Sequence, residues 1–186
     1  MKRLFDIVLS IILLLIFLLP MMLISIAVKV TSAGRVLYWS DRVGKDNVIF
    51  KMPKFRSMMP GTPATATHLL SDPKSALTSI GNFLRKYSLD EFPQLWSIVK
   101  GDMSFVGPRP ALFNQDDLIR LRISQGIDKL MPGLTGWAQI NGRDELPIVE
   151  KVKMDADYLD RQSFMFDLKI LWLTLLKVVK KDGVSH

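Results

Sequence analysis

Cysteine is absent from the 186-residue chain, and histidine occurs only twice, at His68 and His186. The missing thiols exclude disulfide bonds, Cys-ligated zinc and thiol nucleophiles. Two histidines leave almost no room for a histidine-based metal cluster or a Ser-His-Asp triad. Acid–base chemistry, nucleophilic attack and metal binding must therefore fall mainly on carboxylates, which suit hard ions such as Mg²⁺.

Long runs of like charge are also missing, although the chain is basic. It carries 25 Lys and Arg against 18 Asp and Glu, a net charge of +7. This balance favours anionic partners, namely nucleic acid, an anionic membrane surface or phosphate-rich substrates. Because the chain also contains an apolar segment, membrane lipid and phosphate outrank nucleic acid, and we predict no nucleic-acid partner.

The apolar segment runs from Ile7 to Val28 without a charged side chain. As a helix it is long enough to cross the roughly 30 Å hydrocarbon core of a bilayer. It exceeds the apolar region of a signal peptide and no cleavage pattern follows it, so we expect it to be retained.

Pro20 interrupts this segment, because proline removes a helix hydrogen bond and kinks the helix. Basic residues flank both ends: Lys2, Arg3, Lys29 and Arg35. This pattern fits a helix–break–helix that enters and leaves by the cytoplasmic face. A spanning anchor with a proline kink fits the length equally well, so the residues alone leave both topologies open.

Beyond residue 34 the pattern predicts a helix-rich α+β domain. Residues 35–40 and 48–51 have strand composition and predict a hairpin. Helices are expected at 80–100, 111–130, 146–159 and 166–181, with turn-rich or glycine-rich connectors at 59–75, 101–110 and 131–143. The last helix carries Trp172 among four lysines, which is typical of a helix in a membrane interface. A core helix with a solvated lysine edge is the alternative.

Two adjacent carboxylates, Asp90 and Glu91, stand before an apolar-periodic helix, and Pro93 suits its first turn. If Asp90 caps this helix, the helix end offers partial positive charge to a carboxylate or a phosphate. Plain capping, worth about 1 kcal/mol, is the alternative for an isolated Asp-Glu pair.

Several cationic and polar side chains are candidates for binding phosphate. Arg109 lies between two prolines, which restrict its backbone and lower the entropic cost of presenting a guanidinium to phosphate. Between Pro132 and Arg143, three glycines permit close approach to a ligand, and Gln139 and Arg143 offer donors. Further cationic candidates are Lys54, Arg56 and Arg85. Structural ion pairs and a solvated basic face are the alternatives for these residues.

Long motifs in a fixed order resemble the bacterial sugar transferases, the monotopic phosphoglycosyl transferase family, in a minimal catalytic form. They are Lys2-Arg-x-Phe-Asp6, Lys54-Phe-Arg-Ser-Met58, Ser88-Leu-Asp-Glu91, Pro93-Gln-Leu95, Lys100-Gly-Asp-Met-Ser-Phe-Val-Gly-Pro-Arg-Pro110, Pro132-Gly-Leu-Thr-Gly-Trp137 and Asn141-Gly-Arg143. The resemblance extends from Lys2 to about Lys180. It implies an enzyme that transfers a phospho-sugar from a UDP-sugar to undecaprenyl (polyprenyl) phosphate, giving polyprenyl-diphospho-sugar and UMP. We expect an N-acetylated sugar.

The resemblance also implies roles for particular residues. Asp90 would be the nucleophile that forms an aspartyl-phosphosugar, Glu91 its catalytic partner, and both are expected ligands of the cofactor Mg²⁺. Substrate binding is expected from the cationic and polar candidates above and from two downstream aspartates: Lys54, Arg56, Arg85, Arg109, Gln139, Arg143, Asp155 and Asp167. The family's membrane helix breaks at a proline, often as Ser-Pro, whereas Leu19 precedes Pro20 here.

The predicted organisation is a re-entrant membrane helix at residues 1–34 followed by a catalytic domain at 35–186 with a C-terminal amphipathic helix. The expected location is the cytoplasmic face of the bacterial inner membrane. Expected partners are the two substrates, anionic lipids and a second copy of the chain as a homodimer. A non-catalytic membrane-surface adaptor that binds anionic lipid or nucleotide is the rival interpretation, and it predicts that Asp90→Asn is tolerated.

Overall fold

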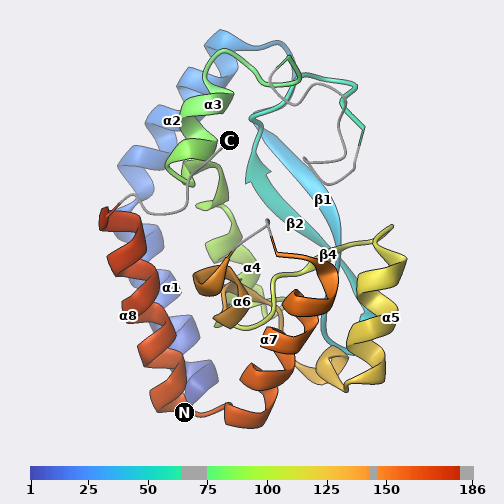
Figure 1. The fold of residues 1–186 in the computed structure, drawn as a ribbon. Coiled ribbons are helices and arrows are strands. Elements are labelled where there is room, and N and C mark those ends of the chain that lie inside the picture. Colours follow the sequence, from blue (N-terminus) through green and yellow to red (C-terminus); the bar gives the residue numbers. More distant parts are fainter. Residues whose placement is uncertain (64–74, 143–145, 181–186) are drawn as a thin grey trace.

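Two helices meet at a sharp bend near the N-terminus of the computed structural model, which describes residues 1–63, 75–142 and 146–180 (Figure 1). Helix α1 (Lys2–Ile16) and helix α2 (Leu18–Thr31) enclose a bend of 61° at Phe17. Since Pro20 has no N–H to donate to the carbonyl of Ile16, α1 ends there and the proline lies in the first turn of α2. The predicted break therefore exists, but it is located three residues before Pro20.

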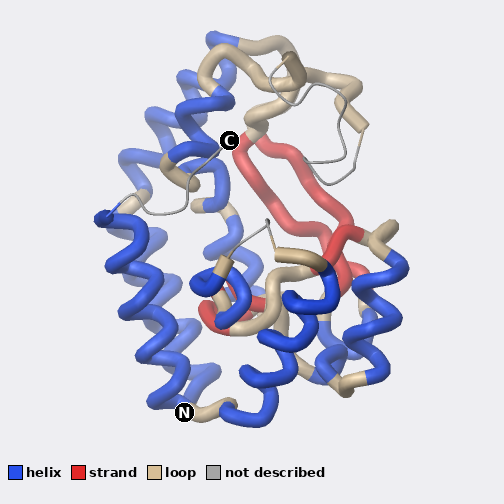
Figure 2. The backbone as a smooth tube through the Cα atoms, in the orientation of Figure 1, coloured by secondary structure: helices blue, strands red, loops and turns tan. Residues whose placement is uncertain are grey.

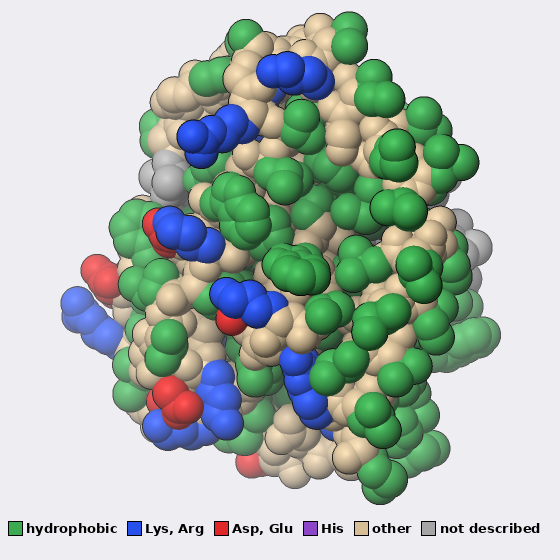
Figure 3. Space-filling view, turned by 180° about the vertical axis from the view of Figure 1, so that it is seen from behind, with side chains coloured by type: hydrophobic (Ala, Val, Ile, Leu, Met, Phe, Trp, Pro, Cys, Tyr) green, Lys and Arg blue, Asp and Glu red, His purple; other side chains and the backbone are tan. Residues whose placement is uncertain are grey.

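The bent pair exposes many apolar side chains. Among the described residues, no single helix is long and apolar enough to cross a bilayer, while α1 and α2 together meet that condition. Figure 3 shows apolar side chains gathered along one side of the molecule. The large apolar side chains that α1 and α2 expose are Leu4, Val8, Ile11, Ile12, Leu15, Ile16, Leu18, Leu19, Met22, Leu23, Ile26 and Val30. A patch of this kind marks a contact with lipid or protein.

The predicted hairpin is present and longer than expected. Strands β1 (Leu37–Val43) and β2 (Ile49–Phe55) pair antiparallel, and the one-turn helix η1 (Lys45–Asn47) joins them. Strand β4 (Ala111–Leu112) pairs with the other edge of β1, which gives the order β2-β1-β4. This sheet places Lys54, near the end of β2, beside the carboxylate motif.

A second, parallel sheet consists of β3 (Ser104–Val106) and β5 (Gly133–Thr135). Both strands lie in segments for which connectors were predicted, because three-residue strands are too short to show an alternating pattern. A Cβ atom on Gly107 would come within 2.1 Å of the Met131 carbonyl oxygen. Only glycine permits that approach, and it brings Arg109 and residues 133–139 to the same region.

Helices form the rest of the molecule (Figure 2). They are α3 (Gly81–Lys86), η3 (Leu89–Glu91), α4 (Gln94–Lys100), α5 (Asp116–Ser124), η4 (Ile127–Lys129), α6 (Trp137–Asn141), α7 (Ile148–Arg161) and α8 (Phe164–Lys180). The helix predicted at 80–100 is three pieces, since Ser88 is left-handed with φ 53° and Pro93 lacks a donor. The helix predicted at 111–130 is β4, α5 and η4. The helices predicted at 146–159 and 166–181 correspond to α7 and α8.

Helix α1 is fastened to the domain through polar groups at its N-terminus. Arg3 donates to the carbonyls of Ile98 and Val99 in the last turn of α4, at 2.6 and 2.9 Å. Lys2 pairs with Asp167 at the start of α8, and buried Asp6 accepts from the backbone N–H of Phe105 at 3.4 Å. The apolar residues of α1 that face inward pack on the main core: Leu9, Leu13 and Leu14. Helix α1, which lies before the predicted boundary at residue 34, therefore packs directly on the domain that follows it.

Candidate active site

A cavity of about 390 Å³ lies beside η3, between the α1–α2 bend and helix α8. This volume is typical of sites that bind small molecules. Polar lining residues are Lys54, Arg85, Ser88, Asp90, Glu91, Arg109, Thr135, Gln139, Thr174 and Lys177. Apolar lining residues include Leu13, Phe17, Phe92, Leu95, Leu171 and Val178. One cavity thus combines carboxylates, cations and an apolar wall.

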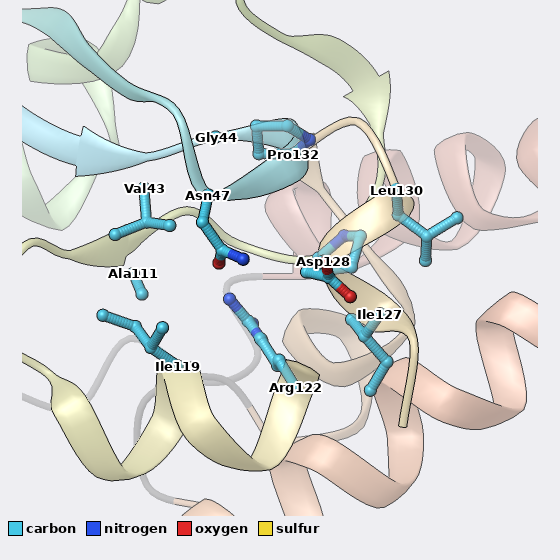
Figure 4. A pocket seen from close by; sticks show the side chains of 11 residues that line it. Val43, Gly44, Asn47, Ala111, Ile119, Arg122, Ile127, Asp128, Leu130 and Pro132 are labelled. Atoms are coloured by element: carbon cyan, nitrogen blue, oxygen red, sulfur yellow. The ribbon is translucent and has the colours of Figure 1, made fainter. Parts of the chain in front are cut away.

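A much smaller cavity of about 30 Å³ lies between the β1–η1 turn, α5 and η4 (Figure 4). Asn47, Arg122 and Asp128 contribute its polar groups. Its volume suits only a few water molecules. It is too small for a nucleotide-sized or sugar-sized ligand, so the larger cavity is the candidate active site.

The two carboxylates lie in the single turn η3, immediately after left-handed Ser88. The backbone N–H of Glu91 donates to the Ser88 carbonyl at 3.2 Å. Asp90 does not cap α4, because α4 begins at Gln94 after Pro93, with no side-chain cap. The Asp90 side chain lines the cavity instead, and only 6% of the residue is exposed to solvent.

Glu91 is held by two cations. Lys54 Nζ and Arg109 Nη2 each lie 2.9 Å from Glu91 Oε1. Burial opposes ionisation of Glu91, but Arg109 and Lys54 outweigh it and hold the pKa of this carboxyl well below its usual value. Glu91 is therefore ionised, and its ion pairs hold Lys54 and Arg109 at the cavity.

The pKa of Asp90 is shifted in the opposite direction from that of Glu91. Burial raises its pKa above the usual 3.8, and neighbouring Glu91 raises it further, against the lowering effects of Lys54, Arg85 and Arg109. A poorly solvated carboxylate is a stronger base and nucleophile than one in water. The surrounding cations can neutralise a phosphate brought up to it, so the arrangement suits attack on phosphorus.

Behind Arg109 lies a buried ion pair that sequence reasoning did not identify. Arg122 donates to Asp155 Oδ2 from Nε and Nη2 at 3.1 and 2.7 Å, and from Nη1 to the Arg109 carbonyl at 2.8 Å. Asp155 is 1% exposed and does not line the cavity. Asp155, predicted to bind substrate, instead holds Arg122, which in turn fixes the backbone of Arg109.

Two other predicted substrate ligands face protein partners as well. Asp167 is buried, pairs with Lys2 and accepts a hydrogen bond from the Tyr158 hydroxyl at 2.7 Å. Arg56 donates to the carbonyls of Ala33 and Ser32, where it closes the C-terminal end of α2. Neither side chain lines the cavity, so both position the N-terminal helices.

Gln139, a predicted substrate ligand, lines the cavity. Its Oε1 and Nε2 atoms are both shielded from solvent and have no hydrogen-bond partner among the described residues. Because an unsatisfied buried amide is costly, this side chain is a candidate to bind a polar ligand. Arg143, the remaining predicted ligand, lies outside the described residues.

Helix α8 supplies four lining residues that were not predicted: Leu171, Thr174, Lys177 and Val178. Their spacing of three and four puts them on one face of the helix. The sequence favoured a membrane interface for this helix, with a core helix as the alternative, and it gave no signal that one face meets Asp90. The contact is fixed by tertiary packing, in which Thr174 and Thr135 hydrogen-bond at 2.8 Å.

The carboxylates fit a magnesium ion only in part. Among residues 1–63, 75–142 and 146–180, no group of three His, Cys, Asp or Glu side chains could enclose a metal. Mg²⁺ is, however, commonly held by one or two carboxylates together with substrate phosphates and water. Asp90 faces the cavity and suits this mode, whereas one oxygen of Glu91 is already occupied by Lys54 and Arg109.

The sequence profile described as bacterial sugar transferase matches residues 1–181. The chain belongs to the bacterial sugar transferase family. This confirms the resemblance that the sequence motifs indicated.

Individual proteins similar to this chain agree with the family assignment. The UDP-glucose:undecaprenyl-phosphate glucose-1-phosphate transferase of Escherichia coli K12 is 40% identical, over 95% of this chain and 40% of the relative. The undecaprenyl-phosphate galactose phosphotransferase of Salmonella typhimurium is 35% identical, over 98% of this chain and 41% of the relative. The uncharacterized sugar transferase EpsL of Bacillus subtilis is 38% identical, over 100% and 91%. The chain thus spans about two fifths of the first two relatives and most of the third.

Proposed function

We propose that this protein is a phosphoglycosyl transferase that moves a phospho-sugar from a UDP-sugar to undecaprenyl phosphate. The observation that carries the proposal is the cavity in which buried Asp90 is surrounded by Lys54, Arg85 and Arg109 and faces an apolar wall. Cations suit a nucleotide diphosphate, and an apolar wall suits a lipid carrier. The printed names of the E. coli and Salmonella relatives specify the same class of reaction for those proteins.

The proposed reaction has two displacements. First, an Asp90 carboxylate oxygen attacks the sugar-linked phosphorus, the bond from that phosphorus to the bridging oxygen breaks, and UMP leaves with the electron pair. Then an oxygen of undecaprenyl phosphate attacks the same phosphorus, and the aspartyl oxygen–phosphorus bond breaks to restore Asp90. Dividing the transfer lets two anionic substrates of different solubility react in turn.

The cations act on charge in both steps. Lys54 and Arg109, held at Glu91, face the diphosphate and offset its repulsion from the Asp90 carboxylate. Arg109 can bind two phosphate oxygens with its planar fork, and Arg122 fixes its backbone. Glu91 keeps the two cations in place while the nucleophile remains the neighbouring carboxylate.

Mg²⁺ is the proposed cofactor, held by Asp90, with Glu91 as a second candidate ligand, and by substrate phosphate oxygens. When bound it would supply charge neutralisation at the diphosphate. EDTA should abolish activity and Mg²⁺ should restore it. Activity that EDTA leaves undiminished would remove the metal from the proposal.

The bent pair α1–α2 is proposed to enter and leave the membrane from the cytoplasmic face. Its exposed apolar surface suits lipid, and the basic residues at both ends favour one side of the bilayer. Asp90 lies in the same cavity as Phe17 at the bend, so the reacting group would be close to the lipid carrier.

The decisive experiment uses UDP-sugar labelled in the sugar, with and without undecaprenyl phosphate. Without acceptor, the wild-type protein should retain label at Asp90 and release one equivalent of UMP. Asp90→Asn should do neither, while Asp157→Asn, at a partly exposed aspartate of α7 that does not line the cavity, should behave as wild type. If Asp90→Asn turns over normally, Asp90 is not the nucleophile. If wild-type protein releases no UMP from any UDP-sugar, the adaptor interpretation replaces the enzyme.

The sugar itself is best found by screening donors. The relatives' names specify glucose and galactose for those proteins. UDP-glucose and UDP-galactose should therefore be compared with the N-acetylated donors expected from the sequence, with UMP release as the readout.

A further inference from the structure

Lys177 differs from the other cations of the cavity in its position and its partners. It projects from α8, whereas Lys54, Arg85 and Arg109 lie on elements around the carboxylate motif. Lys54 and Arg109 are already paired with Glu91. Half-buried Lys177 has no ion pair with any of the residues that the structure describes. A cation that lines a cavity without a carboxylate partner is suited to an anionic ligand.

The surroundings of Lys177 are apolar. Val178 and Leu171 flank it on the cavity face of α8, and Leu13 and Phe17 line the cavity from the α1–α2 bend. Val178 is 56% exposed, so this wall continues outward to the molecular surface. The ligand that matches this part of the cavity has an anionic head and an apolar tail.

We propose that Lys177 binds the phosphate of the polyprenyl phosphate acceptor, whose isoprenoid chain leaves between α8 and the α1–α2 bend. This rests on the proposed function. The cations around Glu91 then bind the diphosphate of the donor, and the two substrates use separate cations in one cavity. Thr174, bonded to Thr135, fixes the helix one turn before Lys177.

The test is the effect of Lys177→Met on UMP release from the donor and on transfer to polyprenyl phosphate. Methionine preserves the unbranched apolar stem of lysine and removes the charge. The KM for polyprenyl phosphate should rise about tenfold, the effect of about 1.4 kcal/mol from one lost charge-assisted contact. Release of UMP from the UDP-sugar alone should stay within twofold of wild type. Lys177→Arg should restore most of the affinity for the acceptor.

Lys169→Met is the matched control, because Lys169 is an exposed lysine of the same helix that does not line the cavity. The assay uses vesicles of neutral lipid and repeats the comparison with a short, water-soluble isoprenyl phosphate. A phosphate contact predicts that the loss in Lys177→Met persists with the short acceptor. An equal loss in both lysine variants would instead indicate attraction of α8 to the membrane, and would overturn the proposal.

A rise in the KM for the UDP-sugar in Lys177→Met would place Lys177 at the donor and would overturn the proposal. Unchanged kinetics in this variant would overturn it as well. Far-ultraviolet circular dichroism and the melting temperature of each variant establish that it is folded. If wild-type protein releases no UMP from any UDP-sugar, the proposed function fails. If wild-type protein turns over while Lys177→Met is unaffected, only the assignment of Lys177 fails.

Discussion

The buried pair of Asp155 and Arg122 allows a stability prediction with a control on the same helix. Asp155→Asn keeps the size of the side chain but leaves the charge of Arg122 without its carboxylate. Asp155 is 1% exposed and Arg122 8%, so water cannot replace the lost partner. Breaking a buried ion pair from one side costs about 3–5 kcal/mol. Because asparagine can still accept a hydrogen bond, we expect a loss near the lower limit, about 3 kcal/mol.

For a chain of this length, each 1 kcal/mol lowers the melting temperature by about 2–4 °C, so Asp155→Asn should melt about 6–12 °C below wild type. Asp157→Asn removes the exposed pair with Arg161, four residues away on the same helix. Exposed pairs of this spacing contribute about 0.3–0.5 kcal/mol, so this control should melt within about 2 °C of wild type. Both melting temperatures are measured by circular dichroism, with all proteins in the same detergent.

Activity should fall in Asp155→Asn as well, because Arg122 also bonds the Arg109 carbonyl. The double variant Asp155→Asn/Arg122→Met should lose less stability than the two single variants added together, since no buried charge remains unpaired. Equal melting of Asp155→Asn and Asp157→Asn would refute the reasoning. It would mean that the pair is solvated in the folded protein and does not fix Arg109.

Three further predictions concern the site and the membrane segment. Arg109→Lys should lower kcat/KM at least tenfold, because an ammonium cannot bind two phosphate oxygens in parallel; near-normal turnover would make Arg109 structural. Lys54→Met should move the acid limb of the pH–rate profile to higher pH, because Lys54 lowers the pKa of both Asp90 and Glu91; a shift to lower pH would contradict this. A single cysteine introduced after Met1 or at position 35 should be labelled only from the cytoplasm. The substitution Pro20→Leu should straighten the segment and expose one of the two positions on the periplasmic side. Periplasmic labelling after Met1 in protein that retains Pro20 would refute the re-entrant topology.

Local features of this protein were predictable because neighbouring residues encode them. The break in the apolar run follows from Pro20, and the hairpin follows from its strand composition and polar turn. The family follows from long motifs in order. Short strands such as β3 and β5 were missed, since three residues are too few to show an alternating pattern. The sequence leaves open whether Asp90 caps a helix, and the structure shows that it does not, because α4 begins only after Pro93.

Pairing between charges was decided by tertiary structure alone. Asp155 and Asp167 were expected to bind substrate, but packing brings Arg122 and Lys2 to them from positions 33 and 165 residues away in the chain. Lys177, expected at a membrane surface, reaches the cavity of Asp90 because α8 packs beside β5. A sequence shows which side chains carry charge, but the energy of a buried charge depends on partners that only the folded chain brings within hydrogen-bond distance.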